Sequence, residues 1–371
     1  MRRIRSLFGA TLLALALVIP PTGAPATPSA RAASVPASPC APLAEGAVAS
    51  PSATWTLAPT GPMLRWQPAA FAPTVCRLVA FGGNDGCCVT NDTWLFDPAS
   101  GAWTKIAGTR TGPSRRDLGG LAWNATGKRV ILFGGRTFGA PGGRNILQDT
   151  WAFDPVKRTW TPLITDCRKN LCPPARYGGA LVWSSAINKL VLFGGSPALA
   201  PDQTLNDVWT FDTSWHRITT TGGPSGRYLF GMAEDAATGM LLVYGGVTLT
   251  SNGMVVVHET WQLDPRTWQW RLLPTAASPV ADAEIGMAWL PSLGAVVVTG
   301  GSADYGGIAS STWMFDRNGP TWVQVGTNQP VPSVHMDATL TTDPCHGVAI
   351  YLGVPDAEVP PSHSDYTWIL R

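Results

Sequence analysis

The chain has 371 residues, of which 45% are hydrophobic and only 13% are charged, and its formal net charge is +2 at pH 7. This balance offers no strongly basic surface, so it argues against nucleic-acid binding and against recruitment to a membrane surface by charge. Length alone would allow two or three domains, but repeat proteins of this size often form one unit.

The N-terminal residues predict export. Three arginines precede an apolar run that is short for a membrane span, and the small residues of PSARAAS follow. We predict a secretory signal peptide over residues 1–32, cleaved after Ala32 or Ala33, and a Pro- and Ala-rich linker over residues 33–52. An uncleaved membrane anchor is the alternative, and no later segment looks transmembrane. The mature chain is therefore expected to be secreted.

The seven cysteines predict disulfides with one thiol left over, because an exported chain meets an oxidising medium. Cys167 and Cys172, in CRKNLC, are the expected local bridge. Zinc is the alternative, but these spacings lack matching His or Cys partners. The sequence leaves the pairing of the other cysteines open.

A repeat fills residues 53–371. Its first copy is LVAFGGNDGCCVTNDTWLFDPASGAWTKI, residues 78–106: an apolar run, Gly-Gly, Trp, an Asp-Pro turn and a second Trp. Later copies follow at steps of 51 to 60 residues, so the first glycines are Gly82, Gly134, Gly194, Gly245 and Gly300. A sixth, degenerate copy has Leu352 and Gly353 in place of the glycine pair.

The short apolar runs are rich in Val, Ile, Leu, Phe and Trp and are cut by Gly, Pro, Asn and Asp, which predicts strands. In the second copy, strand A lies near DLGGLAWN, strand B is KRVILFGG, strand C is DTWAFDP and strand D is TWTPLI. Each copy therefore predicts one four-stranded antiparallel blade. The acids that begin strand C, as in NDTW, and the aspartates of the C–D turns are interpreted as structural. These turn residues are Asp97, Asp154, Asp212, Asp264 and Asp316.

By these glycine pairs, tryptophans and aspartates, the chain resembles the kelch family of β-propellers. The resemblance implies an all-β, six-bladed propeller with four-stranded antiparallel blades around a central channel. ATWTLAPTGP resembles a strand D, and the terminal YTWILR is a strand C with no strand D after it. We therefore predict that the segment near Trp55 joins the blade of Trp368 and closes the ring, which removes exposed edges. Cys76 is expected to face Cys345, because both lie near A–B turns of the blades that flank this closure.

Alternating strand directions put the B–C loops and D–A linkers on one face, the loop face, and the A–B and C–D turns on the other, the turn face. Aligned starts of strand A place six side chains around one mouth of the channel: Arg65, Arg116, Arg176, Arg227, Asp282 and His335. The converging guanidiniums would suit a carboxylate or another anion. The alternative is that each arginine ties neighbouring blades together, and the two roles are compatible.

Other residues extend this predicted ligand site. Tyr177 and Tyr228 follow two of the arginines and would be able to stack on a sugar or a peptide. The longest B–C loop, which carries Arg136 and Arg144, is expected to overhang the mouth.

Two kinds of enzyme are alternatives. Copper-radical oxidases that resemble galactose oxidase need two Tyr and two His on one metal. His258, His335 and His363 would be able to lie on the loop face, but the chain has no adjacent Tyr-His pair and six blades where seven are expected. An acidic-sugar epimerase or hydrolase would use the arginines with Asp282 and Glu284, but no nucleophile constellation is visible.

The sequence therefore favours a secreted, non-catalytic, monomeric propeller with no cofactor and no metal. Its expected partner is an extracellular glycan or protein, with an acidic group, bound on the loop face. No nucleic acid is expected as a partner, and no membrane span is expected after signal removal.

Overall fold

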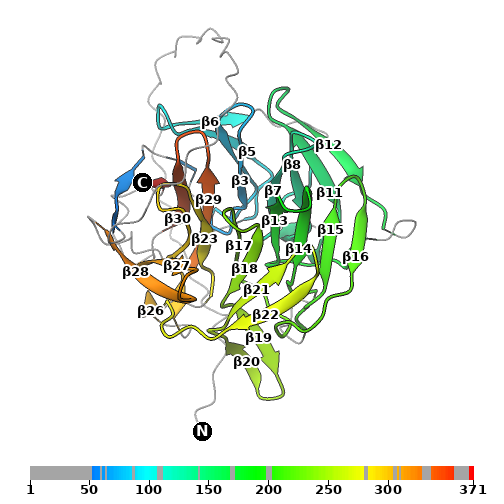
Figure 1. Cartoon of the computed structure of the whole chain (residues 1–371). Helices are drawn as coiled ribbons and strands as arrows, with labels where there is room; N and C mark the ends of the chain where they lie inside the picture. Colours follow the sequence, from blue (N-terminus) through cyan, green and yellow to red (C-terminus); the bar gives the residue numbers. More distant parts are fainter. Residues whose placement is uncertain are drawn as a thin grey trace, which may run out of the picture. The chain divides into compact units, whose positions relative to one another are not determined.

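The computed structural model (Figure 1) describes residues 52–371 apart from short gaps. The gaps are residues 59–60, 63–64, 86–87, 107–111, 141–142, 168–171, 198–202, 280–282, 304–306, 309–310, 328–335 and 355–366. The predicted signal peptide, and all but the last residue of the predicted linker, lie outside the described residues. Every regular element of the described part is a strand. Among these residues, no helical segment has the length and apolar character needed to cross a membrane.

The strands form six blades, each an antiparallel sheet of four strands that can be followed in Figure 1. The innermost strands, from blade 1 to blade 6, are β3 (Ala69–Ala72), β7 (Gly120–Asn124), β13 (Ala180–Ser184), β17 (Gly231–Asp235), β23 (Gly286–Leu290) and β29 (Met336–Asp343). The second strands are β4 (Arg77–Phe81), β8 (Arg129–Phe133), β14 (Lys189–Phe193), β18 (Met240–Tyr244), β24 (Ala295–Thr299) and β30 (Val348–Val354). The third strands are β5 (Thr93–Asp97), β11 (Thr150–Asp154), β15 (Val208–Phe211), β21 (Thr260–Asp264), β27 (Thr312–Asp316) and β31 (Thr367–Leu370). The outermost strands are β6 (Ala102–Ile106), β12 (Thr159–Ile164), β16 (Trp215–Ile218), β22 (Gln269–Leu273), β28 (Thr321–Thr327) and β2 (Trp55–Leu57).

The blades close into a ring. The innermost strands contact one another in the order β3, β7, β13, β17, β23, β29 and back to β3. The outermost strand of blade 6 comes from the other end of the chain, because β2 pairs with β31 in the register Trp55↔Leu370 and Leu57↔Trp368. This confirms the predicted six-bladed propeller and its closure by an N-terminal strand. Just before β2, strand β1 (Ser52–Ala53) adds a parallel fifth strand to blade 5 by pairing with β28.

The glycine pairs end the second strands where two blades approach closely. In all five pairs both glycines have positive φ, a conformation that costs glycine little. A Cβ on Gly134 or on Gly194 would lie 2.6 or 2.7 Å from the carbonyl oxygen of Arg176 or Arg227 in the next blade. Gly-Gly is therefore required both for the turn and for contact between blades.

The outer tryptophans fill the space between blades. Phe81 of blade 1 meets Trp160 of blade 2 with ring centroids 4.9 Å apart, and Phe133 meets Trp215 at 4.8 Å. At five of the six boundaries the indole N–H of this Trp also donates to the Thr that begins the third strand of the preceding blade. The pairs are Trp103–Thr367, Trp160–Thr93, Trp215–Thr150, Trp322–Thr260 and Trp55–Thr312, at 2.8 to 3.2 Å. At the sixth boundary Val208 stands where the Thr would be, opposite Trp270.

Two disulfides lie among the described residues, and one of them joins the first and last blades. Cys76 and Cys345 are joined, with Cα atoms 6.0 Å apart, and connect the A–B turns of blades 1 and 6 beside the closure. Cys167 and Cys172 form the expected local bridge after β12. The structure therefore contains both of the pairings that the sequence suggested.

Candidate functional site

Three arginines of the predicted ligand site lie buried between the blades. Arg116 donates to both carboxylate oxygens of Asp149 at 2.6 and 2.8 Å and to the carbonyl of Gly134 at 2.9 Å. Its remaining N–H groups donate to the carbonyl and hydroxyl of Ser114. Because guanidinium has five N–H donors, Arg116 has none left for a ligand.

The same arrangement recurs in blades 3 and 4. Arg176 binds Asp207 through two hydrogen bonds of 2.7 and 2.8 Å, and Arg227 binds Glu259 at 2.7 Å. Both also donate to the first glycine of their blade, and their backbones bond the preceding blade. Arg116, Arg176 and Arg227 are at most 2% exposed. These contacts favour the alternative role, in which the arginines tie blades together.

The acids that begin strand C have a structural role, as expected, but their partners are side chains. Asp149, Asp207 and Glu259 each accept a hydrogen bond from the arginine of their own blade and one from the indole two residues ahead. Burial raises the pKa of Asp207, but the hydrogen bonds and charge of Arg176 outweigh it, so this pKa lies below its ordinary value. The aspartates of the C–D turns accept backbone N–H groups, as Asp154 does from Val156 and Lys157.

Blade 1 departs from the predicted alignment. The backbone bridge Arg65↔Asn84 corresponds to Asp117↔Arg136, Tyr177↔Ser196 and Tyr228↔Val247 in later blades. Arg65 therefore occupies the position one residue after that of Arg116. Asp282, His335 and His363 lie outside the described residues.

In blade 2, Arg136 lies among an acid and two aromatic rings, next to the buried Arg116. Arg136 donates to Asp117 at 2.9 Å, and its guanidinium lies 5.1 Å over the ring of Trp66 and 5.0 Å over that of Tyr177. Asp117 is fully buried, and its second oxygen has no hydrogen-bond partner; burial raises its pKa despite Arg136. Tyr177 and Tyr228 are buried and pack edge to face at 5.9 Å. The side chain of Arg136 is therefore held by an ion pair and two aromatic rings of blades 1 to 3.

A collar of backbone lines the mouth of the channel in blades 1 to 5, next to Arg136. It consists of five equivalent residues with positive φ: Trp66, Leu118, Gly178, Leu229 and Glu284. The N–H of each of the last four donates to the carbonyl of the residue before it in this list, at 2.8 to 3.1 Å. Four blade boundaries are thus joined by one continuous chain of peptide hydrogen bonds at the mouth.

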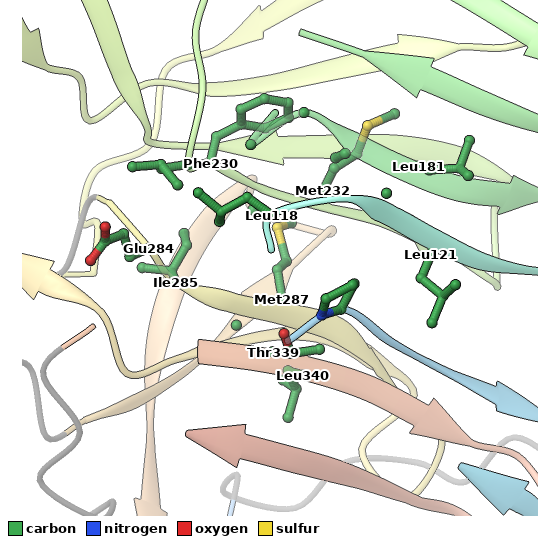
Figure 2. Close-up of a pocket in the computed structure, with 18 of the residues that line it drawn as sticks. Leu118, Leu121, Leu181, Phe230, Met232, Glu284, Ile285, Met287, Thr339 and Leu340 are labelled. Atoms are coloured by element: carbon green, nitrogen blue, oxygen red, sulfur yellow. The ribbon is translucent and has the colours of Figure 1, made fainter. Parts of the chain in front are cut away.

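The collar borders a cavity of about 190 Å³, the loop-side cavity, which is lined mostly by glycine and apolar side chains (Figure 2). Figure 2 shows Glu284 at the opposite end of the view from Leu121 and Leu181. Glu284 is the one ionisable side chain among the described residues that line this cavity. Burial raises its pKa to about 7, although the charge of Arg136 acts in the opposite direction.

An apolar belt separates this cavity from a larger one towards the turn face. Each innermost strand contributes a residue at one equivalent position that lines both cavities: Ala69, Leu121, Leu181, Met232, Met287 and Leu340; Val182 of β13 also lines both. Tight packing of the belt needs the glycines that precede it, because a Cβ on Gly231 or Gly286 would lie 2.8 Å from the Cβ of Met287 or Leu340. The larger, turn-side cavity measures about 540 Å³ and is lined by aromatic side chains that the sequence reasoning missed.

Two-stranded hairpins extend the B–C loops on the loop face. They are formed by β9 (Arg136–Ala140) with β10 (Gly143–Ile146), β19 (Val247–Thr250) with β20 (Gly253–Val256), and β25 (Ser302–Ala303) with β26 (Gly307–Ile308). The predicted long loop of blade 2 is thus a hairpin, and Arg144 is in β10. In Figure 1 the hairpin of β19 and β20 projects from blade 4. It exposes 44% of Met254 and 42% of Val255.

Comparison with known families fits this architecture. The model of the KLHDC2/KLHL20/DRC7 Kelch-repeats domain matches residues 50–171 and 164–352. The chain belongs to the kelch-repeat family. Several known proteins are similar to this chain, each over only a part of its own length.

The kelch chain is 30% identical over 154 residues to "Adagio-like protein 1" of Oryza sativa subsp. japonica, which covers 39% of this chain and 23% of that protein. It is 28% identical over 243 residues to "Putative adagio-like protein 2" of the same plant, covering 59% of the chain and 36% of the relative. The "Leucine-zipper-like transcriptional regulator 1 homolog" of Drosophila melanogaster is 23% identical over 302 residues, covering 76% and 29%. The chain thus spans about a quarter to a third of the length of these relatives.

The kelch propeller shows few groups that could carry catalysis. Within the described ranges, no three His, Cys, Asp or Glu side chains gather as a metal site would require. His258, one of the three histidines considered for copper, precedes Glu259 at the end of the B–C loop of blade 4. Asp117 and Glu284 are carboxyls with raised pKa values, and the charge of Arg136 acts on both of them.

Proposed function

We propose that this kelch propeller is an exported, monomeric and non-catalytic binding module, without cofactor, that takes a protein ligand on its loop face. The single observation that carries the proposal is the hairpin of β19 and β20. Met254 and Val255 are consecutive residues of β20, so their side chains point to opposite faces of the hairpin, and both are more than two-fifths exposed. Exposed apolar side chains on a projecting element are typical of a protein-binding surface.

The hairpin is well placed to present these residues. At its base Val247 is fully buried and bonds the backbone of Tyr228 in both directions at 2.9 and 3.0 Å. Thr248 donates to the carbonyl of Gly226, and the Tyr228 hydroxyl contacts the sulfur of Met254 at 3.4 Å. A base fixed in this way lowers the conformational entropy that the tip would lose on binding.

An acidic group on the ligand, as the sequence suggested, gains no support from Arg116, Arg176 and Arg227, because these three side chains are buried and each already binds a carboxylate of its own blade. A glycan ligand is the alternative, and it would need polar groups with free donors near the mouth. Protein binding through an apolar strand requires neither. We therefore retain protein as the ligand class.

The test is affinity capture from the medium in which the chain is secreted, with three baits. The wild type and the double variant Met254→Lys/Val255→Lys are compared with Val156→Lys, in which a 70% exposed apolar residue of a turn-face loop is changed. A protein retained by the wild type and by Val156→Lys, but lost from the double variant, supports the proposal. Equal retention by all three overturns it, and so does binding on a glycan array without any protein partner.

Export is tested separately by N-terminal sequencing of the mature protein. A chain that begins at Ala33 or Ser34 supports cleavage after Ala32 or Ala33. A chain that is found only inside the cell with its first 32 residues attached contradicts it.

A further inference from the structure

The turn-side end of the channel carries a ring of side chains that the proposed function does not use. At one equivalent position, next to the A–B turn, the six innermost strands contribute Phe71, Trp123, Trp183, Glu234, Trp289 and Thr342, and all six line the turn-side cavity. Trp123, Trp183 and Glu234 stand in consecutive blades whose innermost strands are in contact. We name these six residues the aromatic rim.

The volume of the cavity is suitable for a small organic molecule. At about 540 Å³ it falls within the range of ligand pockets. The three tryptophans are half-buried: each packs on the core between its own blade and the preceding one and keeps part of its surface towards solvent. Packing on one side holds the rings in place, which favours a preformed site.

The charge of the rim has one sign. Glu234 is the one ionisable side chain among the described residues that line this cavity, and no Lys, Arg or His is among them. One oxygen of Glu234 accepts the N–H and the hydroxyl of Ser185 in the neighbouring blade at 2.6 and 2.9 Å. Burial raises the pKa of Glu234, while these bonds and the charge of Arg266 favour its ionised form. The same bonds hold the carboxyl group against the end of β13, the strand that contains Trp183.

One rim tryptophan already has a cation over its ring. The Arg317 guanidinium lies 5.5 Å from the ring centroid of Trp289 and pairs with Asp235 at 3.1 Å. Trp123 and Trp183 have no cation over their rings among the described residues. Trp is the side chain that attracts cations most strongly through its π face.

We propose that the aromatic rim binds an organic cation, such as a quaternary ammonium group, between the rings of Trp123 and Trp183 and the carboxylate of Glu234. The site lies at the opposite end of the channel from the loop-face hairpin. Its occupancy is therefore independent of the protein ligand proposed above.

The experiment uses the purified chain with choline and with 3,3-dimethylbutan-1-ol, in which a carbon replaces the charged nitrogen. Saturation-transfer NMR on the methyl groups, followed by titration, gives the affinity of each. Choline is expected to bind roughly threefold to thirtyfold more tightly than the neutral alcohol, the scale of a cation–π contact. Equal affinity of the two, or no saturation transfer to choline, overturns the proposal.

Variants locate the site. Glu234→Gln and Trp183→Leu should each weaken choline binding by a similar factor, whereas Glu284→Gln, which changes the carboxyl at the other end of the channel, should leave it unchanged. If Trp183→Leu does not fold, as judged by its thermal melt, Trp183→Phe keeps a ring of lower π attraction and should still bind more weakly. Loss of binding in Glu284→Gln with normal binding in Glu234→Gln would place the cation elsewhere and overturn the assignment.

Discussion

At the residue scale, the arginines show how a charged side chain can become part of the frame of a propeller. Each guanidinium joins the end of a second strand, through a glycine carbonyl, to the acid that begins the third strand. The backbone of the same arginine bonds the preceding blade. One residue therefore fixes both the inside of a blade and its boundary.

Replacing Arg176 by Ala should lower the free energy of unfolding by about 3–5 kcal/mol, because it leaves the Asp207 carboxylate without its charged partner and the Gly194 carbonyl without its side-chain donor. Urea unfolding at pH 7 measures the loss. Arg217→Ala, an exposed arginine of the same blade, is the control and should stay within about 0.5 kcal/mol of the wild type. If Arg176→Ala keeps full stability but loses its ligand, the binding role predicted from the sequence is correct.

Glu284 should make the folded chain less stable as the pH rises. Burial favours its neutral form, so its pKa rises from 4.5 to about 7 in the folded chain, and the folded state binds the extra proton between these values. Stability should therefore fall as pH rises through this range. Glu284→Gln removes this dependence and should gain most over the wild type near pH 8 and least near pH 4. Melting temperatures across pH 4–8 measure it, and parallel curves for the two proteins would contradict it.

The sequence located some of these residues and not others. Aligning the starts of strand A placed Arg116, Arg176 and Arg227 at equivalent positions correctly, because the repeat keeps their distance from the glycine pair constant in blades 2 to 4. It misplaced Arg65, which lies one residue closer to its glycine pair than the other three arginines do. Their pairing with acids depends on contacts across a B–C loop of variable length, which the spacing does not show.

At the element scale, the outer strands are joined by a repeated bond from Trp to Thr that is missing at one boundary. Trp270 of β22 packs on the core between blades 3 and 4, where Val208 begins β15. The corresponding residue in blades 1, 2, 4, 5 and 6 is Thr. The boundary between blades 3 and 4 thus lacks one side-chain hydrogen bond.

Val208→Thr should supply that bond and raise the free energy of unfolding by about 1 kcal/mol, the net value of a buried hydrogen bond. The reciprocal change, Thr93→Val, removes the acceptor of Trp160 and should lower it by a similar amount. Chemical denaturation of both variants measures the pair. A Val208→Thr chain less stable than the wild type would show that Trp270 is oriented differently from the other outer tryptophans.

The strand pattern itself was predictable. Short apolar runs that end in Gly-Gly predicted the second strands, and segments like DTWAFD predicted the third strands. Both predictions depend on local composition alone. The hairpins β19–β20 and β25–β26 were not foreseen, since their sequences look like ordinary loops between two recognised strands. The aromatic rim was also missed, although GLAW, ALVW and GMAW repeat at the ends of three innermost strands. Only the closed ring brings those tryptophans to one cavity.

At the scale of the whole molecule, two independent devices close the ring. Strand β2 pairs with β31, and Trp55, which is 1% exposed, bonds Thr312 in blade 5. The Cys76–Cys345 disulfide connects residues 269 apart in sequence on the same side of the ring, between blades 6 and 1. We therefore expect either contact to keep the first and last blades together when the other is lost.

Deleting residues 33–60 should lower the melting temperature sharply, because it exposes the edge of β31 and removes Trp55 from the core. The remaining disulfide should still hold the ring, so a reductant should lower the melting temperature further, and by more in the deletion variant than in the wild type. Thermal melts of both proteins with and without reductant measure this. An unchanged melt after the deletion would show that β2 does not contribute to closure.

The hydrogen bonds of the collar also make it possible to follow how the blades separate from one another. The amide protons of Leu118, Gly178, Leu229 and Glu284 are each held by the adjacent blade, so none of them can exchange with solvent while its two neighbouring blades stay in place. In hydrogen exchange, these four amides should therefore report the separation of individual blade boundaries. Similar rates at all four would mean that the propeller opens as a single cooperative unit, and a faster amide would identify the boundary at which it opens first.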